Sequence, residues 1–237
     1  MDLYKEALSQ KFNKASTSYD SVATVQKESA HILVNLFKDH ASQFEPQSIL
    51  DVGTGTDIAA AILSKHFPKS VYTLNDIAPA MLKIAVSKLD GYDFNLLLGD
   101  IEQLSFSKHD LIISNFSLQW STNLLQTVKK LYHNTHCLAF SCLLSNTFYE
   151  WSNLFQQLSL PIPTPIYPSY QALTAFLLSL NPKSHAFHQQ SFTLHFASAH
   201  HFMMYLKQLG AQQGGKKIGL NDLKKILNHY PKALSVT

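Results

Sequence analysis

The most informative segment of the chain is a glycine turn that follows an apolar run. Residues 48–52 predict a buried strand, and an alanine-rich stretch from Asp57 to about Lys65 predicts a helix. Gly53 and Gly55, which lie between them, have no Cβ, so the backbone can turn sharply and approach a ligand closely. The N-terminus of the helix adds N–H groups without helical partners. This context predicts a nucleotide site, and a purely structural turn is the alternative.

Further apolar runs in the same half of the chain each end in a polar residue. These runs predict strands at residues 71–76, 94–100 and 110–115. They end in Asp76, Asp100 and Asn115. Strands that alternate with helices predict a parallel sheet with its ligand at the carboxyl ends of the strands, where an acid after the second strand can bind a ribose. Each acid alone is better explained as a solvated turn residue or a helix cap, but together they predict an α/β, Rossmann-like fold.

Composition narrows the class of protein. The chain has 237 residues, of which 46% are hydrophobic and 15% charged, and its net charge of +3 gives no argument for nucleic acid as a partner. No apolar run approaches the roughly 18 residues of a membrane span, and no signal peptide is evident, so we expect a cytoplasmic protein. The twelve histidines and two cysteines lack the spacing of metal ligands. All 19 basic residues are lysines, so no guanidinium is present to bind an anion.

The strand-end pattern resembles the class I S-adenosylmethionine (SAM)-dependent methyltransferases. The resemblance implies a methionine-binding turn, a ribose-binding acid and an adenine-flanking pair. Its cofactor contacts would come from Asp51, Gly53, Gly55, Asp76, Asp100, Ile101 and Asn115. Helices are then expected on both faces of the sheet.

Asp57 departs from this pattern, because glycine is usual at its position. Dinucleotide-binding folds also need a third glycine there, and a carboxylate would repel their pyrophosphate. SAM carries a sulfonium and no phosphate, so it tolerates an acid better. We therefore expect Asp57 either to cap the following helix or to weaken cofactor binding.

Three further segments resemble the malonyl-ACP O-methyltransferase family of biotin synthesis (BioC), where ACP is the acyl carrier protein. They are KFNKASTSYD at 11–20, SNFSLQW at 114–120 and YLKQLGA at 205–211. The resemblance implies that the first segment closes over the SAM pocket with Tyr19 facing the active site. It also implies that the substrate is the free carboxylate of malonyl-ACP.

The expected reaction needs no general base, because a carboxylate with a pKa near 4 is already an anionic nucleophile at neutral pH. Positioning and removal of water then carry catalysis. Tyr19 and Gln119 are our candidates to hold the substrate carboxylate. An acidic carrier would suit the lysine pairs at 129–130, 216–217 and 224–225, although a solvated helix face is the better explanation of any single pair. We expect a monomer.

The chain divides, by these expectations, into four parts. They are an N-terminal helical arm at 1–45, the SAM-binding core at 46–145, an inserted lid at 146–200 and a return to the core at 201–237. Local patterns predict helices at 22–38, 170–180 and 222–229, the last capped by Asn221, and strands at 190–196 and from 235 onward. A methyltransferase of a free small diacid and a non-catalytic methyltransferase-like binding protein remain alternatives.

Overall fold

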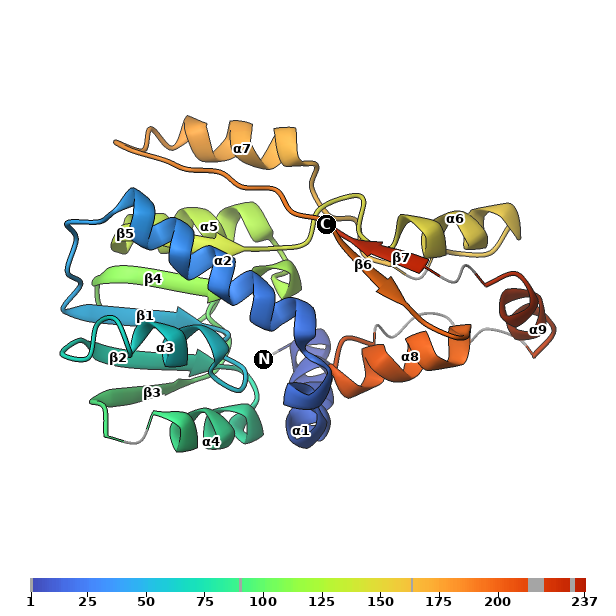
Figure 1. Cartoon of the computed structure of the whole chain (residues 1–237), viewed down its shortest axis with the longest axis horizontal. Helices are drawn as coiled ribbons and strands as arrows, with labels where there is room; N and C mark the ends of the chain where they lie inside the picture. Colours follow the sequence, from blue (N-terminus) through green and yellow to red (C-terminus); the bar gives the residue numbers. More distant parts are fainter. Residues whose placement is uncertain (1, 90, 163, 213–219, 231–232) are drawn as a thin grey trace. The chain divides into compact units, whose positions relative to one another are not determined.

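The computed structural model describes residues 2–89, 91–162, 164–212, 220–230 and 233–237. Contacts divide the chain into two compact units (Figure 1). The sheet unit comprises Met1–Cys142 with Ser184–Ala186, and the C-terminal unit comprises Leu143–Lys183 with Phe187–Thr237. The four-part division expected above, with a lid at 146–200, stays a prediction.

A five-stranded parallel sheet forms the centre of the sheet unit, in the order β3-β2-β1-β4-β5. Its strands are β1 (Ser48–Val52), β2 (Val71–Asp76), β3 (Phe94–Leu98), β4 (His109–Asn115) and β5 (Thr135–Ser141). The strand order reverses between β1 and β4, and in open parallel sheets ligands bind beside such a reversal. The predicted Rossmann-like α/β fold and its first four strands are confirmed.

Helices cover both faces of this sheet. They are α1 (Leu3–Val22), α2 (Thr24–His40), α3 (Ile58–Leu63), α4 (Pro79–Lys88), the short 3₁₀ turn η1 (Leu118–Trp120) and α5 (Leu124–His133). In Figure 1, α2 and α3 cross one face of the sheet and α5 lies behind it. Val34 and Leu63 on these helices and Ile49 on β1 are fully buried in one apolar core. Each such burial contributes about 1.5–3 kcal/mol to folding and fixes the strand ends that carry the polar residues.

The first helix, α1, is longer than the segment expected at 11–20. Asp2 caps it, since its carboxylate accepts a hydrogen bond of 2.8 Å from the Lys5 backbone N–H. The helix continues without a break to Val22, and α2 starts directly after Ala23. The predicted helix at 22–38 is confirmed as α2.

The C-terminal unit has its own core and a small sheet. Its elements are α6 (Tyr149–Gln157), α7 (Tyr170–Ser179), β6 (Phe192–His195), α8 (Ala199–Gln208), α9 (Leu220–Asn228) and β7 (Ala233–Val236). Strands β6 and β7 pair antiparallel, and Trp151, Phe155 and Phe202 pack in the core. The helix at 170–180 and the strands at 190–196 and near 235 are thus confirmed, with small shifts at their ends.

Asn221 lies inside α9, one residue after its start, so the predicted cap is wrong: a capping residue has a non-helical backbone. Lys216 and Lys217 lie outside the described residues.

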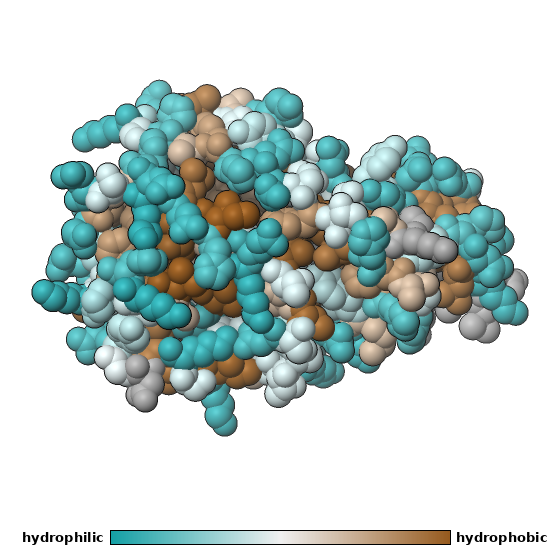
Figure 2. All heavy atoms as spheres, viewed as in Figure 1, coloured by the Kyte–Doolittle hydropathy of each residue, from teal (hydrophilic) through white to brown (hydrophobic). Residues whose placement is uncertain are grey.

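One face of the molecule carries many polar side chains. On the face shown in Figure 2, hydrophilic side chains cover much of the surface and hydrophobic ones show between them. In the part of the chain that the structure describes, no helix has both the length and the apolar character to cross a membrane.

Candidate active site

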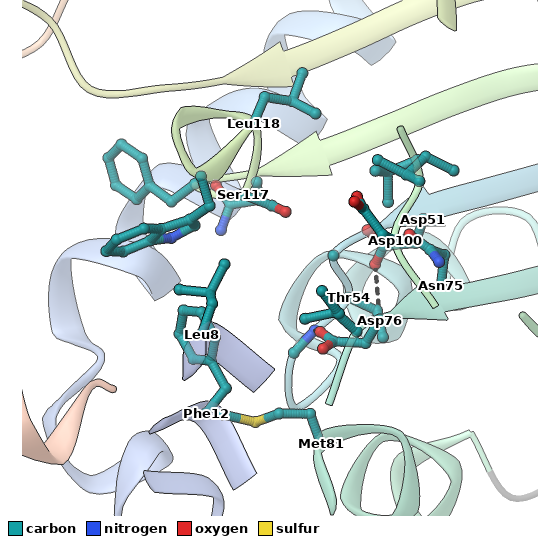
Figure 3. Close-up of a pocket in the computed structure, with 18 of the residues that line it drawn as sticks. Leu8, Phe12, Asp51, Thr54, Asn75, Asp76, Met81, Asp100, Ser117 and Leu118 are labelled. Atoms are coloured by element: carbon teal, nitrogen blue, oxygen red, sulfur yellow. Dashed lines mark hydrogen bonds between the residues drawn. The ribbon is translucent and has the colours of Figure 1, made fainter. Parts of the chain in front are cut away.

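A pocket opens at the carboxyl ends of β1, β2 and β4, entirely within the sheet unit (Figure 3). Its lining includes every predicted site residue except Gln119: Tyr19, Asp51, Gly53, Gly55, Asp76, Asp100, Ile101 and Asn115. In Figure 3, Leu8 and Phe12 of α1 lie across the pocket from Thr54 and Asp76. The fold therefore gathers residues from five segments around one cavity.

The glycine turn forms the floor of this pocket. Gly53 and Gly55 have φ of +65° and +57°, a left-handed backbone that favours glycine. A Cβ on Gly53 would lie 1.8 Å from the Ser117 Oγ and 2.4 Å from its Cβ, so the turn needs glycine there to admit Ser117. The Gly55 N–H donates to the Asp76 carboxylate at 2.9 Å, which ties the first two strand ends together.

Asp57 also has a left-handed backbone, with φ of 66°, which explains why glycine suits this position. Its side chain makes no capping hydrogen bond, so the predicted side-chain cap of α3 is wrong. The carboxyl is fully buried under the turn, and its Oδ2 has no hydrogen-bond partner among the described residues. Its Oδ1 lies 3.5 Å from the Thr54 hydroxyl, which also donates to Asp51 at 3.0 Å.

The carboxyl groups at this turn hold their protons unusually well. Burial raises the pKa of Asp51 to about 7 and, with the nearby Asp51 charge, that of Asp57 to about 8. Burial also raises the pKa of Asp76 to about 6, although backbone N–H groups of Ala78 and Gly55 oppose the rise. No ion pair recorded for the described residues involves these three acids. Such a site fits a ligand that brings its own positive charge.

The opposite end of the pocket contains a buried lysine that the sequence reasoning missed. The Lys5 ammonium lies 3.3 Å from Asp100, also pairs with Glu102 and donates to the Trp120 carbonyl at 3.2 Å. Burial alone would raise the pKa of Glu102, but its bonds to Lys5 and Thr122 lower it to about 2. The spacing of Lys5, Leu8, Phe12 and Tyr19, which places them on one helix face, is the signal that could have found it.

Hydrogen bonds hold α1 against the rim of the pocket at three further points. The Ser9 hydroxyl donates to the Ile77 carbonyl at 2.8 Å, and Asn13 accepts from the Ala80 N–H at 2.9 Å. Asp20 accepts from the Thr56 hydroxyl at 2.5 Å and pairs with Lys88 at 2.8 Å. The helix is therefore fixed along its length as one wall of the pocket.

The turn after β4 forms another wall. The Asn115 amide donates to the Gln26 carbonyl at 2.9 Å and accepts from Ser141 at 2.8 Å. The Gln119 amide donates to the Phe116 carbonyl at 2.7 Å, inside the turn itself. Gln119 thus supports the turn, and its predicted contact with substrate stays a prediction. Ser117, on the same turn, lines the pocket; it was missed because it stands at an unspecified position of the motif at 114–120.

Among the described residues, no three or more histidine, cysteine, aspartate or glutamate side chains are arranged to hold a metal ion. The chemistry available in the pocket is that of buried acids, glycine backbone, one paired lysine and hydroxyl groups.

Comparisons with known proteins identify methyltransferases as relatives of this chain. A family model described as a methyltransferase domain matches residues 49–136, the segment from β1 into β5. The malonyl-acyl carrier protein O-methyltransferase of Neorickettsia risticii is 34% identical over 230 residues, which cover 97% of this chain and 92% of that protein. The enzyme of the same name from Anoxybacillus flavithermus is 32% identical and covers 87% of this chain and 80% of its own.

A solved structure agrees on the fold. The plantazolicin methyltransferase BpumL, in complex with S-adenosylhomocysteine (SAH), superposes on this chain with a TM-score of 0.55 at 16% identity. The superposition covers 98% of this chain and 93% of that one. This likeness supports the class I methyltransferase fold. Because the Neorickettsia relative is similar over almost the whole of both chains, this protein belongs to the malonyl-acyl carrier protein O-methyltransferase family.

Proposed function

We propose that this chain transfers a methyl group from SAM to the free carboxylate of malonyl-ACP, giving the methyl ester. The near full-length similarity to the Neorickettsia enzyme carries this proposal. The pocket supports it, since Asp51 and Asp76, two buried acids that line the pocket, are suited to a ligand with a sulfonium and an ammonium group.

The residues of the pocket suit the parts of SAM in order. The Gly53–Gly55 turn and Asp51 would hold the methionine part, next to the unpaired acids. Asp76 would accept hydrogen bonds from the ribose, because a carboxylate that takes two N–H bonds has lone pairs left. Asp100 and Ile101 would flank the adenine.

When bound, SAM supplies a methyl on a positively charged sulfur; transfer forms the O–CH3 bond of the ester, breaks the S–CH3 bond and leaves SAH. The protein has to align the carboxylate with that methyl and keep water away from both. Leu8, Phe12 and Trp120 supply apolar surface for this purpose, and the rings of Phe12 and Trp120 pack edge to face at 5.6 Å. Tyr19 would contact the substrate from α1.

The test is direct methylation by the purified full chain. Incubation with SAM and malonyl-ACP should add the mass of one methyl group to the carrier, as read by mass spectrometry of the intact protein. Free malonate, malonyl-CoA and acetyl-ACP serve as comparison substrates. Tight SAH binding by calorimetry without any methylated product would instead favour a binding protein, and methylation of malonate alone would favour a small-diacid enzyme.

The expected monomer and cytoplasmic location remain predictions from the sequence. Light scattering of the purified chain measures the first, and fractionation of cells that express it measures the second.

A further inference from the structure

Methylation of a carboxylate requires the protein to hold an anion, and this chain has no arginine to do so. Lys5 supplies the ammonium among the residues that line the pocket, but it already serves Asp100, Glu102 and the Trp120 carbonyl. Among the side chains that line the pocket, the remaining candidate donors to the substrate are hydroxyls, amides and an indole.

Most polar side chains in the pocket are already engaged. Asn75 donates to the carbonyls of Leu97 and Gly99, at 2.8 and 3.0 Å. The Asn115 amide donates to Gln26, and the Thr54 hydroxyl donates to Asp51. These donors hold the strand ends together and are not available for a substrate.

Ser117 differs from them. It lines the pocket, and no hydrogen bond of its hydroxyl is recorded among the described residues. The same holds for Ser121, but only Ser117 is recorded next to Gly53. Its Oγ occupies the space beside Gly53 in which a Cβ would collide with it. On the proposed function, that space adjoins the methionine part of SAM, and hence the methyl that reacts. The Trp120 ring packs edge to face against Phe12 at 5.6 Å, and its carbonyl accepts a hydrogen bond from Lys5.

The backbone around Ser117 is strained and held in place. Phe116 has φ of 48°, a left-handed conformation that is rare for a bulky residue. The Phe116 N–H donates to the Ser141 hydroxyl at 3.1 Å, and the Gln119 amide binds the Phe116 carbonyl. Strain of this kind persists where surrounding contacts enforce it, and it clusters at functional sites.

We propose that the Ser117 hydroxyl donates a hydrogen bond to the substrate carboxylate and orients it toward the reacting methyl. The inference rests on the proposed function and adds a specificity-determining residue to it. It also assigns a purpose to the missing Cβ of Gly53, which leaves the hydroxyl its place above the turn.

The experiment measures recognition of the carboxylate itself. Binding of malonyl-ACP and of acetyl-ACP, which lacks the carboxylate, is titrated into the SAH-saturated wild type and into Ser117→Ala. A hydrogen bond to a charged group predicts about 10-fold weaker binding of malonyl-ACP, with acetyl-ACP unchanged. Ser117→Cys, which keeps the volume but donates weakly, should behave like Ser117→Ala. Ser87→Ala, an exposed serine on α4, is the matched control.

The cofactor also has a carboxylate, so SAH binding by each variant shows whether the Ser117 hydroxyl binds the carboxylate of the cofactor or that of the substrate. Unchanged SAH affinity with a selective loss for malonyl-ACP supports the proposal. Weaker SAH binding without loss of malonyl-ACP discrimination would assign the hydroxyl to the cofactor and overturn it, as would no change in either ligand. If the wild type fails to methylate malonyl-ACP at all, the proposed function fails, and that result is read independently of Ser117.

Discussion

The two ends of the pocket bury carboxyl groups in opposite ways. Under the glycine turn, Asp51, Asp57 and Asp76 are at most 7% exposed, take part in no ion pair recorded for the described residues and have raised pKa values. At the α1 end, Asp100 and Glu102 share the Lys5 ammonium, and the pKa of Glu102 is lowered. The pKa values of buried carboxyl groups thus shift in opposite directions, depending on whether the protein itself supplies a cation beside them.

The two ends also predict opposite dependence of stability on pH. A raised pKa means that the folded chain binds more protons than the unfolded one, so the turn acids lose stability as pH rises from about 4 to about 8. The lowered pKa of Glu102 gives stability that is complete above about 4.5 and is lost as pH falls toward about 2. Glu102 shares the acid limb of the stability profile with Asp20, Asp110 and Glu150, whose pKa values are also lowered.

Removing the built-in cation should have the largest effect. Lys5→Met leaves two partly buried carboxylates without a cation, which predicts a loss of up to about 3 kcal/mol in the free energy of unfolding, measured with urea at pH 7. The same change at Lys225, whose ion pair with Asp222 is exposed, should cost at most about 1 kcal/mol. Equal losses in the two variants would show that Lys5 is not a buried partner.

A smaller effect is expected from alanine at the two glycines of the turn. Gly55→Ala should cost about 1–2 kcal/mol for its left-handed backbone alone, since nothing lies within 4 Å of the added Cβ. Gly53→Ala adds a collision with Ser117, so it should cost more stability and also reduce malonyl-ACP methylation. Thermal unfolding and turnover of both variants measure the difference, and indistinguishable variants would contradict the close packing at Ser117.

Asp57→Asn tests the unpaired end without changing its shape. Asparagine tolerates the left-handed backbone and cannot titrate, so the loss of stability between pH 5 and pH 8 should become shallower than in the wild type. Urea unfolding at several pH values gives the slope. Asp39→Asn, on the exposed face of α2, should leave the slope unchanged. An unchanged slope in Asp57→Asn would assign the titration to other groups.

The smallest expected effect is the release of protons from the protein when SAM binds. A cation bound in the pocket lowers the pKa of Asp51, which lines it, and of Asp57, which is buried close to Asp51. SAM should therefore displace a fraction of a proton at pH 7, and its affinity should rise from pH 6 to pH 8. Calorimetry in two buffers of different ionisation enthalpy measures the release. Asp57→Asn should release fewer protons, and an identical release in both proteins would exclude Asp57 from the linkage.

Much of the fold could be predicted, because strand and helix patterns are local. The apolar runs at 48–52 and 71–76 have the length of strands, and the glycines after the first run permit a turn with positive φ. The ends of elements were less predictable: α9 begins before Asn221, and α1 extends well beyond the segment that carried the motif. Frayed ends depend on packing that no local pattern records.

The site was predicted in part for the same reason. Residues at strand ends, such as Asp51 and Asp76, meet at one edge of any parallel sheet, so their places follow from the order of elements. Lys5 and Ser117 come from a helix and a turn whose docking depends on contacts far away in the chain. Gln119 belongs to a recognisable motif, yet its amide bonds within the turn rather than lining the pocket.

The sequence by itself determined the parallel sheet, the glycine turn and the family, because these depend on residue order and on backbone freedom. Tertiary structure decided which carboxyl groups are paired and which keep their protons, because that depends on burial and on the distance to a cation. Asp57 illustrates the division. Its residue type marked a departure from the usual glycine, but only the folded chain placed it in a left-handed backbone, buried beneath the turn and away from the pocket lining.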